Sequence, residues 1–264
     1  MSESALENNA RGEIDTDRLL CLALDVGEGM LKNGGEINRV ENTVERICLA
    51  YGAAHIEVFA IPSVIIAALR NADGSYSSQV RRIAQTENNL LRLEQFNEIS
   101  RRVCRQTPPL EEVDRLIHAA KTKRSYPIWI RNLAGAVAAG SFAVFFGGSW
   151  RDGLAAALIG VLIGLVDLLP VRQVNRLAKT LIQSFLGGML AWLSVLIGFG
   201  TDVGMIMIGT IMLLIPGLAF GTALRDLLCG DLLAGTLKTV QACLAALMIA
   251  AGYLLSMLVM GGVL

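Results

Sequence analysis

Two neighbouring residues, Pro216 and Gly217, interrupt a long apolar stretch of the sequence and are the first candidates for chemistry. Proline removes a backbone hydrogen bond from a helix, and glycine loosens the helix beside it. In membrane transporters, an interrupted helix exposes backbone dipoles that hold a substrate near the middle of the bilayer. The other interpretation is a simple kink that neighbouring helices absorb. The pair therefore predicts either a substrate site or a packing kink.

A mixed segment, residues 225–236, follows this stretch and carries charges among apolar residues and glycines. It is typical of a re-entrant or amphipathic stretch, or of an ordinary interfacial loop. Arg225 is placed to pair with Asp226 or to attract an anionic substrate, and Asp231 is placed to accept a proton. Asp167, near the end of another apolar stretch, is either a functional carboxylate or one solvated at the interface. The candidates for substrate binding or coupling are Asp167, Pro216, Gly217, Thr222, Arg225, Asp226, Gly230 and Asp231.

A second group of polar residues lies near the other end of the sequence, where Gly34 and Gly35 break the chain between two helical patterns. The plain interpretation is a turn between helices, followed by a solvated polar face. The functional interpretation takes this turn and the first polar positions after it as a site. The candidates of this group are Gly35, Glu36, Arg39 and Glu41.

Motifs for catalysis, metal binding or cofactor binding are missing from the sequence. It contains no G-x-x-x-x-G-K-[ST], no H-E-x-x-H and no G-x-S-x-G. Its two histidines, His55 and His118, are far apart, so no zinc cluster is expected. The five cysteines are scattered without C-x-x-C spacing, which favours free thiols in a reducing compartment. We therefore expect no enzyme, no catalytic residue, no metal and no cofactor.

Composition divides the chain into two unlike halves. Hydrophobic residues make up 53% of the sequence and charged residues 17%, and most of the charged residues lie before residue 131. Basic residues and the aromatic Tyr126 and Trp129 stand at the border, as at the point where a chain enters a membrane. The second half, residues 126–264, is expected to be a transmembrane domain of about five helices. Its spans are predicted at about 128–146, 153–170, 181–199, 203–224 and 237–260.

The loops between these spans predict the orientation of the chain. Lysine and arginine gather at the entry and in the loops after the second and fourth spans, whereas the other loops carry Arg151 alone. This distribution places the soluble half inside and the C-terminus outside. Small residues recur at four-residue spacing, which is typical of closely packed membrane helices: Gly135 and Ala139, Gly160 and Gly164, Gly200 and Gly204, Gly217 and Gly221.

The first half is predicted to contain a disordered N-terminus, residues 1–14, and a cytosolic α+β domain, residues 15–125. Thr16 can cap a first helix, whose apolar stripe is Leu19, Leu22, Ala23, Val26 and Met30. A second helix begins near Glu36 and ends before Gly52. Short β-branched runs then predict strands around 55–61, 64–69 and 75–83. Two more helices are expected at about 87–105 and after Pro108-Pro109. The fold class is thus a membrane α-helical bundle with an N-terminal cytosolic α+β domain.

Two stretches of the sequence resemble the threonine/serine exporter family. The run Gly34–Glu41, the later Gly52 and the strand around Ile61-Pro62-Ser63 resemble the cytosolic region of that family. A second set resembles its proline-glycine span and following acidic loop, namely Ile215-Pro216-Gly217, Ala223–Leu228, Gly230-Asp231 and Gly235. The resemblance extends from about residue 15 to the end. Asp167 matches no motif position of the family.

The resemblance implies more than the residues alone. Family members are long single chains or pairs, in which a longer subunit carries the soluble domain and a short subunit is membrane-only. This chain resembles the longer subunit, so a short membrane-only partner, or another copy of the chain, is expected to complete the bundle. The implied activity is proton-driven export of a small polar carboxylate solute: threonine, serine, or a dicarboxylate such as succinate. The implied location is the bacterial inner membrane.

From these observations we expect a subunit of a secondary exporter. The broken fourth span would hold the solute carboxylate at the N-terminus of its second half. Asp226 or Asp231 would be the coupling carboxylate, and the cytosolic domain would collect or gate substrate. The alternative is a membrane-anchored sensor or assembly protein, whose α+β domain binds a ligand or partner and whose helices serve only as a scaffold.

Overall fold

The computed structural model describes residues 15–70, 74–84, 86–123, 126–166 and 175–261. These residues form two compact units, each of which is described by itself. The head unit comprises the described residues up to 125 together with Leu218–Thr239. The bundle unit comprises Tyr126–Gly217 and the described residues from Val240. The predicted N-terminus 1–14 and the candidate Asp167 lie outside the described residues.

A three-stranded antiparallel sheet with the order β1-β2-β3 forms one layer of the head unit. Its strands are β1 His55–Ile61, β2 Val64–Arg70 and β3 Tyr76–Arg82. Ile61 pairs with Val64, so Pro62 and Ser63 make the tight turn between β1 and β2. The three predicted strands are confirmed within one or two residues. In β1 and β2 the inward-facing positions are the apolar Ile56, Ala60, Ile65, Ala67 and Leu69.

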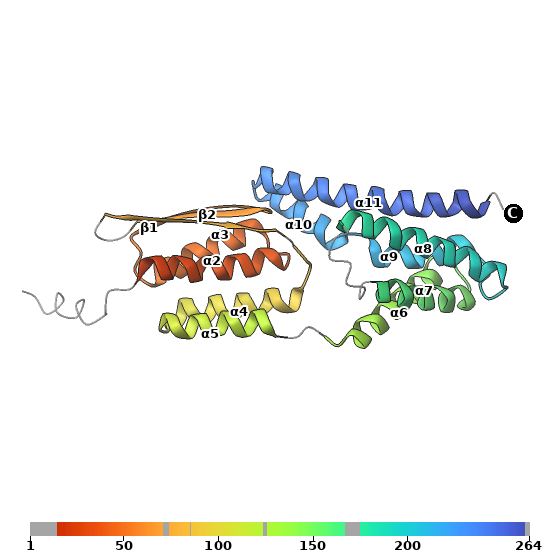
Figure 1. The fold of residues 1–264 in the computed structure, drawn as a ribbon, viewed down its shortest axis with the longest axis horizontal. Helices are drawn as coiled ribbons and strands as arrows, with labels where there is room; N and C mark the ends of the chain where they lie inside the picture. The colour runs from red at the N-terminus through yellow and green to blue at the C-terminus, as the bar shows by residue number, and fades with distance from the viewer. Residues whose placement is uncertain (1–14, 71–73, 85, 124–125, 167–174, 262–264) are drawn as a thin grey trace, which may run out of the picture. The chain divides into compact units, whose positions relative to one another are not determined.

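Four helices form the other two layers of the head unit (Figure 1). The helices α2 Thr16–Lys32 and α3 Ile37–Ala50 lie under the sheet, and α4 Leu90–Gln106 and α5 Leu110–Thr122 cover them from below. The predicted stripe of α2 is buried as expected. However, Leu20, Leu24 and Leu31, on its other side, are also at most 2% exposed. A helix in a middle layer packs against the sheet and against other helices, so a single apolar stripe cannot describe it.

The start of α2 corrects the predicted N-cap, and its end shows how Gly34 and Gly35 break the chain. The N-cap of α2 is Asp15, not Thr16, and its carboxylate accepts a hydrogen bond from the Arg18 N–H at 3.0 Å. At the other end, Gly34 adopts a φ of 92°, a left-handed conformation that side chains disfavour. The Gly35 N–H then donates to the Met30 carbonyl at 2.9 Å. This turn delivers the chain directly to the start of α3.

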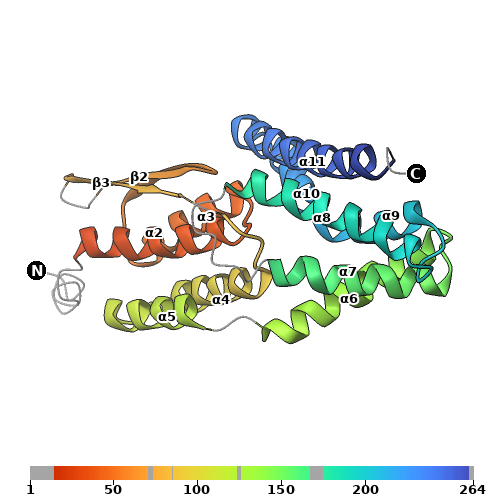
Figure 2. The ribbon, with the colours of Figure 1, turned by 45° about the vertical axis from the view of Figure 1, so that its right-hand side comes forward.

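Helices also dominate the rest of the chain (Figure 2). They are α6 Ile128–Phe145, α7 Trp150–Val166, α8 Arg176–Leu196, α9 Val203–Leu214, α10 Gly217–Leu228 and α11 Leu232–Gly261. Among the described residues, α6, α8 and α11 are each long and apolar enough to cross a membrane, and α9 with α10 make a fourth candidate if counted as one span. The helix break predicted at Pro216-Gly217 is confirmed. Part of the predicted second span, 167–170, lies outside the described residues.

Small residues allow the helices of the bundle unit to approach closely. A methyl group added at Gly209 of α9 would lie 2.4 Å from the Ala139 carbonyl oxygen of α6, and one at Gly160 would lie 3.2 Å from the Ala139 Cβ. The prediction is wrong for three other glycines, since methyl groups added at Gly135, Gly217 and Gly221 would meet nothing within 4 Å among the described residues. Four-residue spacing marks one face of a helix, but it does not say whether a neighbour covers that face.

The contact at Gly209 gives a stability prediction. Gly209→Ala should lower the free energy of unfolding by about 1–3 kcal/mol, because the methyl group overpacks the junction of α9 and α6. Gly135→Ala in α6 is the matched control, since nothing lies within 4 Å of an added methyl group there. That control should be neutral or stabilising by about 0.5–1 kcal/mol. Unfolding of the purified chain in detergent, followed by circular dichroism, measures both, and equal effects would contradict the packing described.

Candidate functional site

The most deeply buried charge in the head unit is the Asp226 side chain of α10, which is 1% exposed. The Lys238 ammonium of α11 lies 2.6 Å from its Oδ2. The Ile37 N–H, at the start of α3, donates to Oδ1 at 3.3 Å. Lys238 also donates to the Gly35 carbonyl at 3.2 Å. Two candidate groups that lie far apart in the sequence are thus brought into one site.

A tight turn between α10 and α11 brings Asp226 and Lys238 together, although they are 12 residues apart. Gly230 has a φ of 96°, and the Asp231 N–H donates to the Asp226 carbonyl at 2.9 Å. The Gly235 N–H donates in turn to the Asp231 carbonyl at 2.8 Å. A methyl group at Gly235 would lie 2.6 Å from Leu227 Cγ, so glycine is needed for the two helices to meet closely.

The start of α3 depends on this turn for its cap. Glu36 occupies the N-cap position of α3, but its side chain makes no capping hydrogen bond. Asp226, 189 residues further along the chain, accepts the Ile37 N–H instead. A carboxylate at this point also interacts favourably with the positive end of the helix dipole. The Glu36 side chain, released from capping, pairs with Arg225 at 2.8 Å.

Two further carboxyl groups lie near the ion pair. Glu41 accepts the Ala60 N–H of β1 at 2.7 Å. Burial raises the pKa of Glu41, the Ala60 hydrogen bond opposes this, and the charges of Asp231 and Asp226 raise it further. Burial also raises the pKa of Asp231, as does the charge of Asp226, whereas Lys238 lowers it. The site therefore holds two carboxyl groups with increased proton affinity beside one that a lysine neutralises.

One carboxylate oxygen of Asp231, the buried Oδ2, lacks a hydrogen-bond donor among the described residues. A buried oxygen without a donor destabilises the ionised form of a carboxyl group, and a bound proton removes that penalty. The unpartnered oxygen and the raised pKa thus both favour the protonated form of Asp231.

The other candidates lie elsewhere or make local contacts. Arg39 is exposed and donates to Asn97 Oδ1 at 3.0 Å. The Thr222 hydroxyl donates to the Ala219 carbonyl of its own helix at 3.0 Å. Pro216 lies at the break between α9 and α10, and Gly217 begins α10. The predicted Arg225–Asp226 pair is wrong, because Arg225 reaches Glu36 and leaves Asp226 to Lys238.

Sequence reasoning overlooked two polar residues that make buried polar contacts, Lys238 and Asp152. Lys238 entered only as a basic residue in the loop count, since its role needs the turn after α10. Asp152 of the bundle unit is 1% exposed and binds the Thr201 N–H at 2.6 Å and the Asp202 N–H at 2.9 Å. A signal for it existed, because Ser149-Trp150-Arg151-Asp152 fits the S-x-x-D capping box. The Ser149 N–H indeed donates to Asp152 at 2.8 Å. Asp152 thus ties the turn before α7 to the turn before α9.

Comparisons with known proteins agree on one family. The model of the family described as "Putative threonine/serine exporter" matches residues 21–260. A Mycobacterium tuberculosis (strain ATCC 25618 / H37Rv) protein named "Probable threonine/serine exporter" is 22% identical over 251 residues, covering 93% of this chain and 47% of that protein. The chain therefore spans about half the length of the curated relative it matches. No solved structure matches significantly.

Double substitution tests the ion pair. Asp226→Asn should lower the free energy of unfolding by about 3–5 kcal/mol, because it leaves the Lys238 ammonium buried without an ionised partner. Adding Lys238→Met should recover much of this loss, so that the two effects are strongly non-additive. The measurement is chemical unfolding of the purified chain.

The matched control for this cycle is the pair of Glu36 with Arg225, whose side chain is 63% exposed. Glu36→Gln with Arg225→Met should show a coupling below about 1 kcal/mol. Additive effects of Asp226→Asn and Lys238→Met would show that the buried pair does not hold the site together.

Proposed function

Because the chain belongs to the threonine/serine exporter family, we propose that it is a subunit of a proton-driven secondary exporter for threonine, serine or similar small amino acids. The observation that carries the proposal is the ion pair of Asp226 with Lys238, with the carboxyl groups of Asp231 and Glu41 near Asp226. It joins the two stretches that carry the family resemblance. Small dicarboxylates such as succinate are a second substrate class that the same chemistry allows.

We propose the topology expected from the loops: a cytosolic domain, about five spans and a C-terminus on the outer side of a bacterial inner membrane. The contacts of Asp152 support it. They join the turn before α7 to the turn before α9, and the proposed topology places both turns on the outer side. The break between α9 and α10 supports a fourth span that is interrupted rather than continuous.

In the proposed mechanism Asp226 and Asp231 have different roles. Asp226 is the fixed centre of the site, because Lys238 forms an ion pair with its carboxylate and the Ile37 N–H donates a hydrogen bond to it. Asp231 takes up and releases the coupling proton, since its Oδ2 is buried without a partner among the described residues. A raised pKa means that Asp231 is protonated at pH values above the ordinary aspartate range. Protonation also removes one negative charge from the neighbourhood of Glu41 and Asp226.

The substrate carboxylate is proposed to bind at the start of α10. The first N–H groups of a helix have no partner within the helix and attract anions. Gly217 and Gly221 lie on this first part of α10, and added methyl groups there would meet nothing within 4 Å. The absence of side chains leaves room for a small solute to approach the backbone.

A second subunit is proposed to complete the transport path. The chain spans about half of the curated relative it matches, which supports a short membrane-only partner or a second copy as the missing half. A bundle with an odd number of spans cannot supply two matched inverted halves by itself. The alternative function, a membrane-anchored sensor or assembly protein, gains support only from a cavity in the head unit.

Measuring solute efflux from cells distinguishes an exporter subunit from a sensor or assembly protein. Cells expressing the chain with its partner should export labelled threonine or serine when a proton gradient is imposed, and cells expressing the chain alone should not. Asp231→Asn should reduce proton-driven efflux at least tenfold, because the amide cannot carry the proton. The acidic titration in the pH profile should disappear with it. The control is Glu98→Gln, an exposed carboxylate of α4.

Two results would count against the proposal. If Asp226→Asn and Asp231→Asn both keep wild-type proton-driven efflux, the cluster does not couple protons. If no small amino acid or dicarboxylate leaves the cells with any partner, the sensor interpretation replaces the exporter.

A further inference from the structure

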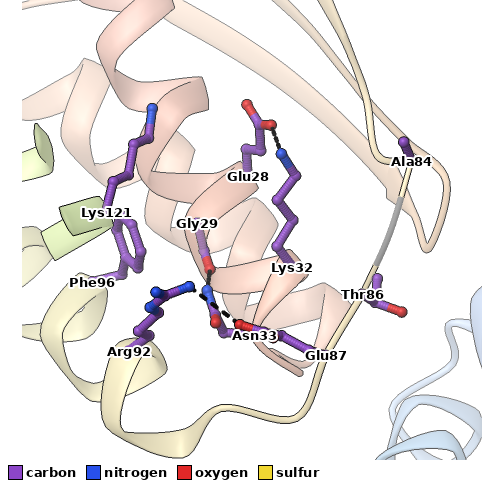
Figure 3. A pocket seen from close by; sticks show the side chains of 10 residues that line it. All are labelled: Glu28, Gly29, Lys32, Asn33, Ala84, Thr86, Glu87, Arg92, Phe96 and Lys121. Carbon is purple, nitrogen blue, oxygen red and sulfur yellow. Dashed lines mark hydrogen bonds and ion pairs between the residues drawn. The ribbon is translucent and has the colours of Figure 1, made fainter. Parts of the chain in front are cut away.

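A cavity of about 410 Å³ opens in the head unit beside the turn between α2 and α3. Residues of α2, α4 and α5 line it together with the segment between β3 and α4 (Figure 3). Its size lies within the range of small-molecule sites. It is separate from the ion pair of Asp226 and Lys238, neither of which lines it.

Two polar atoms in this cavity wall lack partners among the described residues. Asn33 is 5% exposed, and its Nδ2 donates to the Gly29 carbonyl at 2.6 Å, but its Oδ1 accepts nothing. The Arg92 guanidinium donates through Nη1 to Glu87 at 3.2 Å, whereas its buried Nε donates to nothing. A buried polar atom destabilises the folded protein when it stays unsatisfied. One is an acceptor and the other a donor, so a ligand with both functions would satisfy both.

The surrounding backbone holds these two side chains in place. The Glu87 N–H donates to the Lys32 carbonyl at 2.7 Å, which fastens the segment after β3 to the end of α2. The Asn89 N–H donates to the Asn33 carbonyl at 3.3 Å. The Asn89 side chain caps α4 by accepting the Arg92 N–H at 3.1 Å. The site is therefore built before any ligand arrives, which lowers the entropy lost on binding.

The cavity wall contains three cationic and two anionic side chains, and a third anionic partner, Asp25, lies outside the lining. The three cationic side chains are all paired: Lys32 with Glu28, Arg92 with Glu87 at 3.2 Å, and Lys121 with Asp25 at 3.0 Å. A ligand with a large net charge would meet like charges in this wall. A neutral ligand that carries one positive and one negative group fits better.

We propose that this cavity binds a small zwitterion of the α-amino acid class, with its ammonium at Asn33 Oδ1 and its carboxylate at Arg92 Nε. The ammonium supplies the donor that Asn33 lacks, and the carboxylate supplies the acceptor that Arg92 lacks. This site rests on the proposed function and deepens it, because it assigns recognition of the solute to the head unit, and its binding test can fail while efflux persists.

Binding to the purified full chain in detergent tests the proposal by calorimetry. Serine and threonine should bind. Ethanolamine, which lacks the carboxylate, and N-acetylserine, which lacks the ammonium, should bind at least tenfold more weakly. Succinate should also be at least tenfold weaker. These ligands test the assignment on the unaltered chain, so the result does not depend on the folding of a variant.

Hydrogen exchange shows where the ligand binds. Serine should slow amide exchange in residues 28–33 and 86–96, and Asn33→Leu or Arg92→Gln should abolish this slowing. Arg101→Gln, an exposed arginine further along α4, is the matched control and should bind normally. Asp231→Asn should also bind normally, which separates this site from the exporter proposal. Unchanged protection in folded Arg92→Gln, or succinate binding as tightly as serine, would overturn the assignment.

Discussion

The buried carboxylate of Asp226 is the constraint on which the rest of the head unit depends. A charge that is 1% exposed is stable only if nearby groups replace the water it has lost. Lys238 provides the opposite charge, and the first N–H of α3 provides a hydrogen bond. Meeting both needs requires the turn between α10 and α11 to lie against the turn between α2 and α3. One side chain thus fixes how two distant parts of the sequence assemble.

The short turn Gly34–Glu36 connects the two polar sites of the head unit. Asn33, immediately before it, lines the cavity, and Gly35 and Ile37, at its other end, bind Lys238 and Asp226. Gly34 has a left-handed φ that side chains disfavour, so the turn needs glycine at this position. The two polar sites are therefore built on the same short turn.

Sequence periodicity accounts for much of the head unit, because strand and helix patterns are local. It predicted the inward face of α2 from Leu19 to Met30, but not the burial of Leu20 and Leu24, since nothing local shows that a helix lies in a middle layer. It found Asp226 and Asp231 but missed Lys238, whose role comes from a long-range turn. The pairing of Arg225 with Glu36 was equally out of reach, because 189 residues separate them. The Ser149–Asp152 capping box, in contrast, is a local pattern that could have been predicted from the sequence but was overlooked.

The cap of α3 has a consequence for how the protein is made. During synthesis α2 through α5 leave the ribosome first and α6 through α9 follow, so Asp226 emerges only after them. Until then the first N–H of α3 has no carboxylate, and Ala234 is missing from the core that it joins. The newly made α+β region therefore waits, incompletely packed, while later helices are synthesised. The same region expressed alone and ending at residue 123 would lack both the Asp226 carboxylate at the start of α3 and Ala234 in its core.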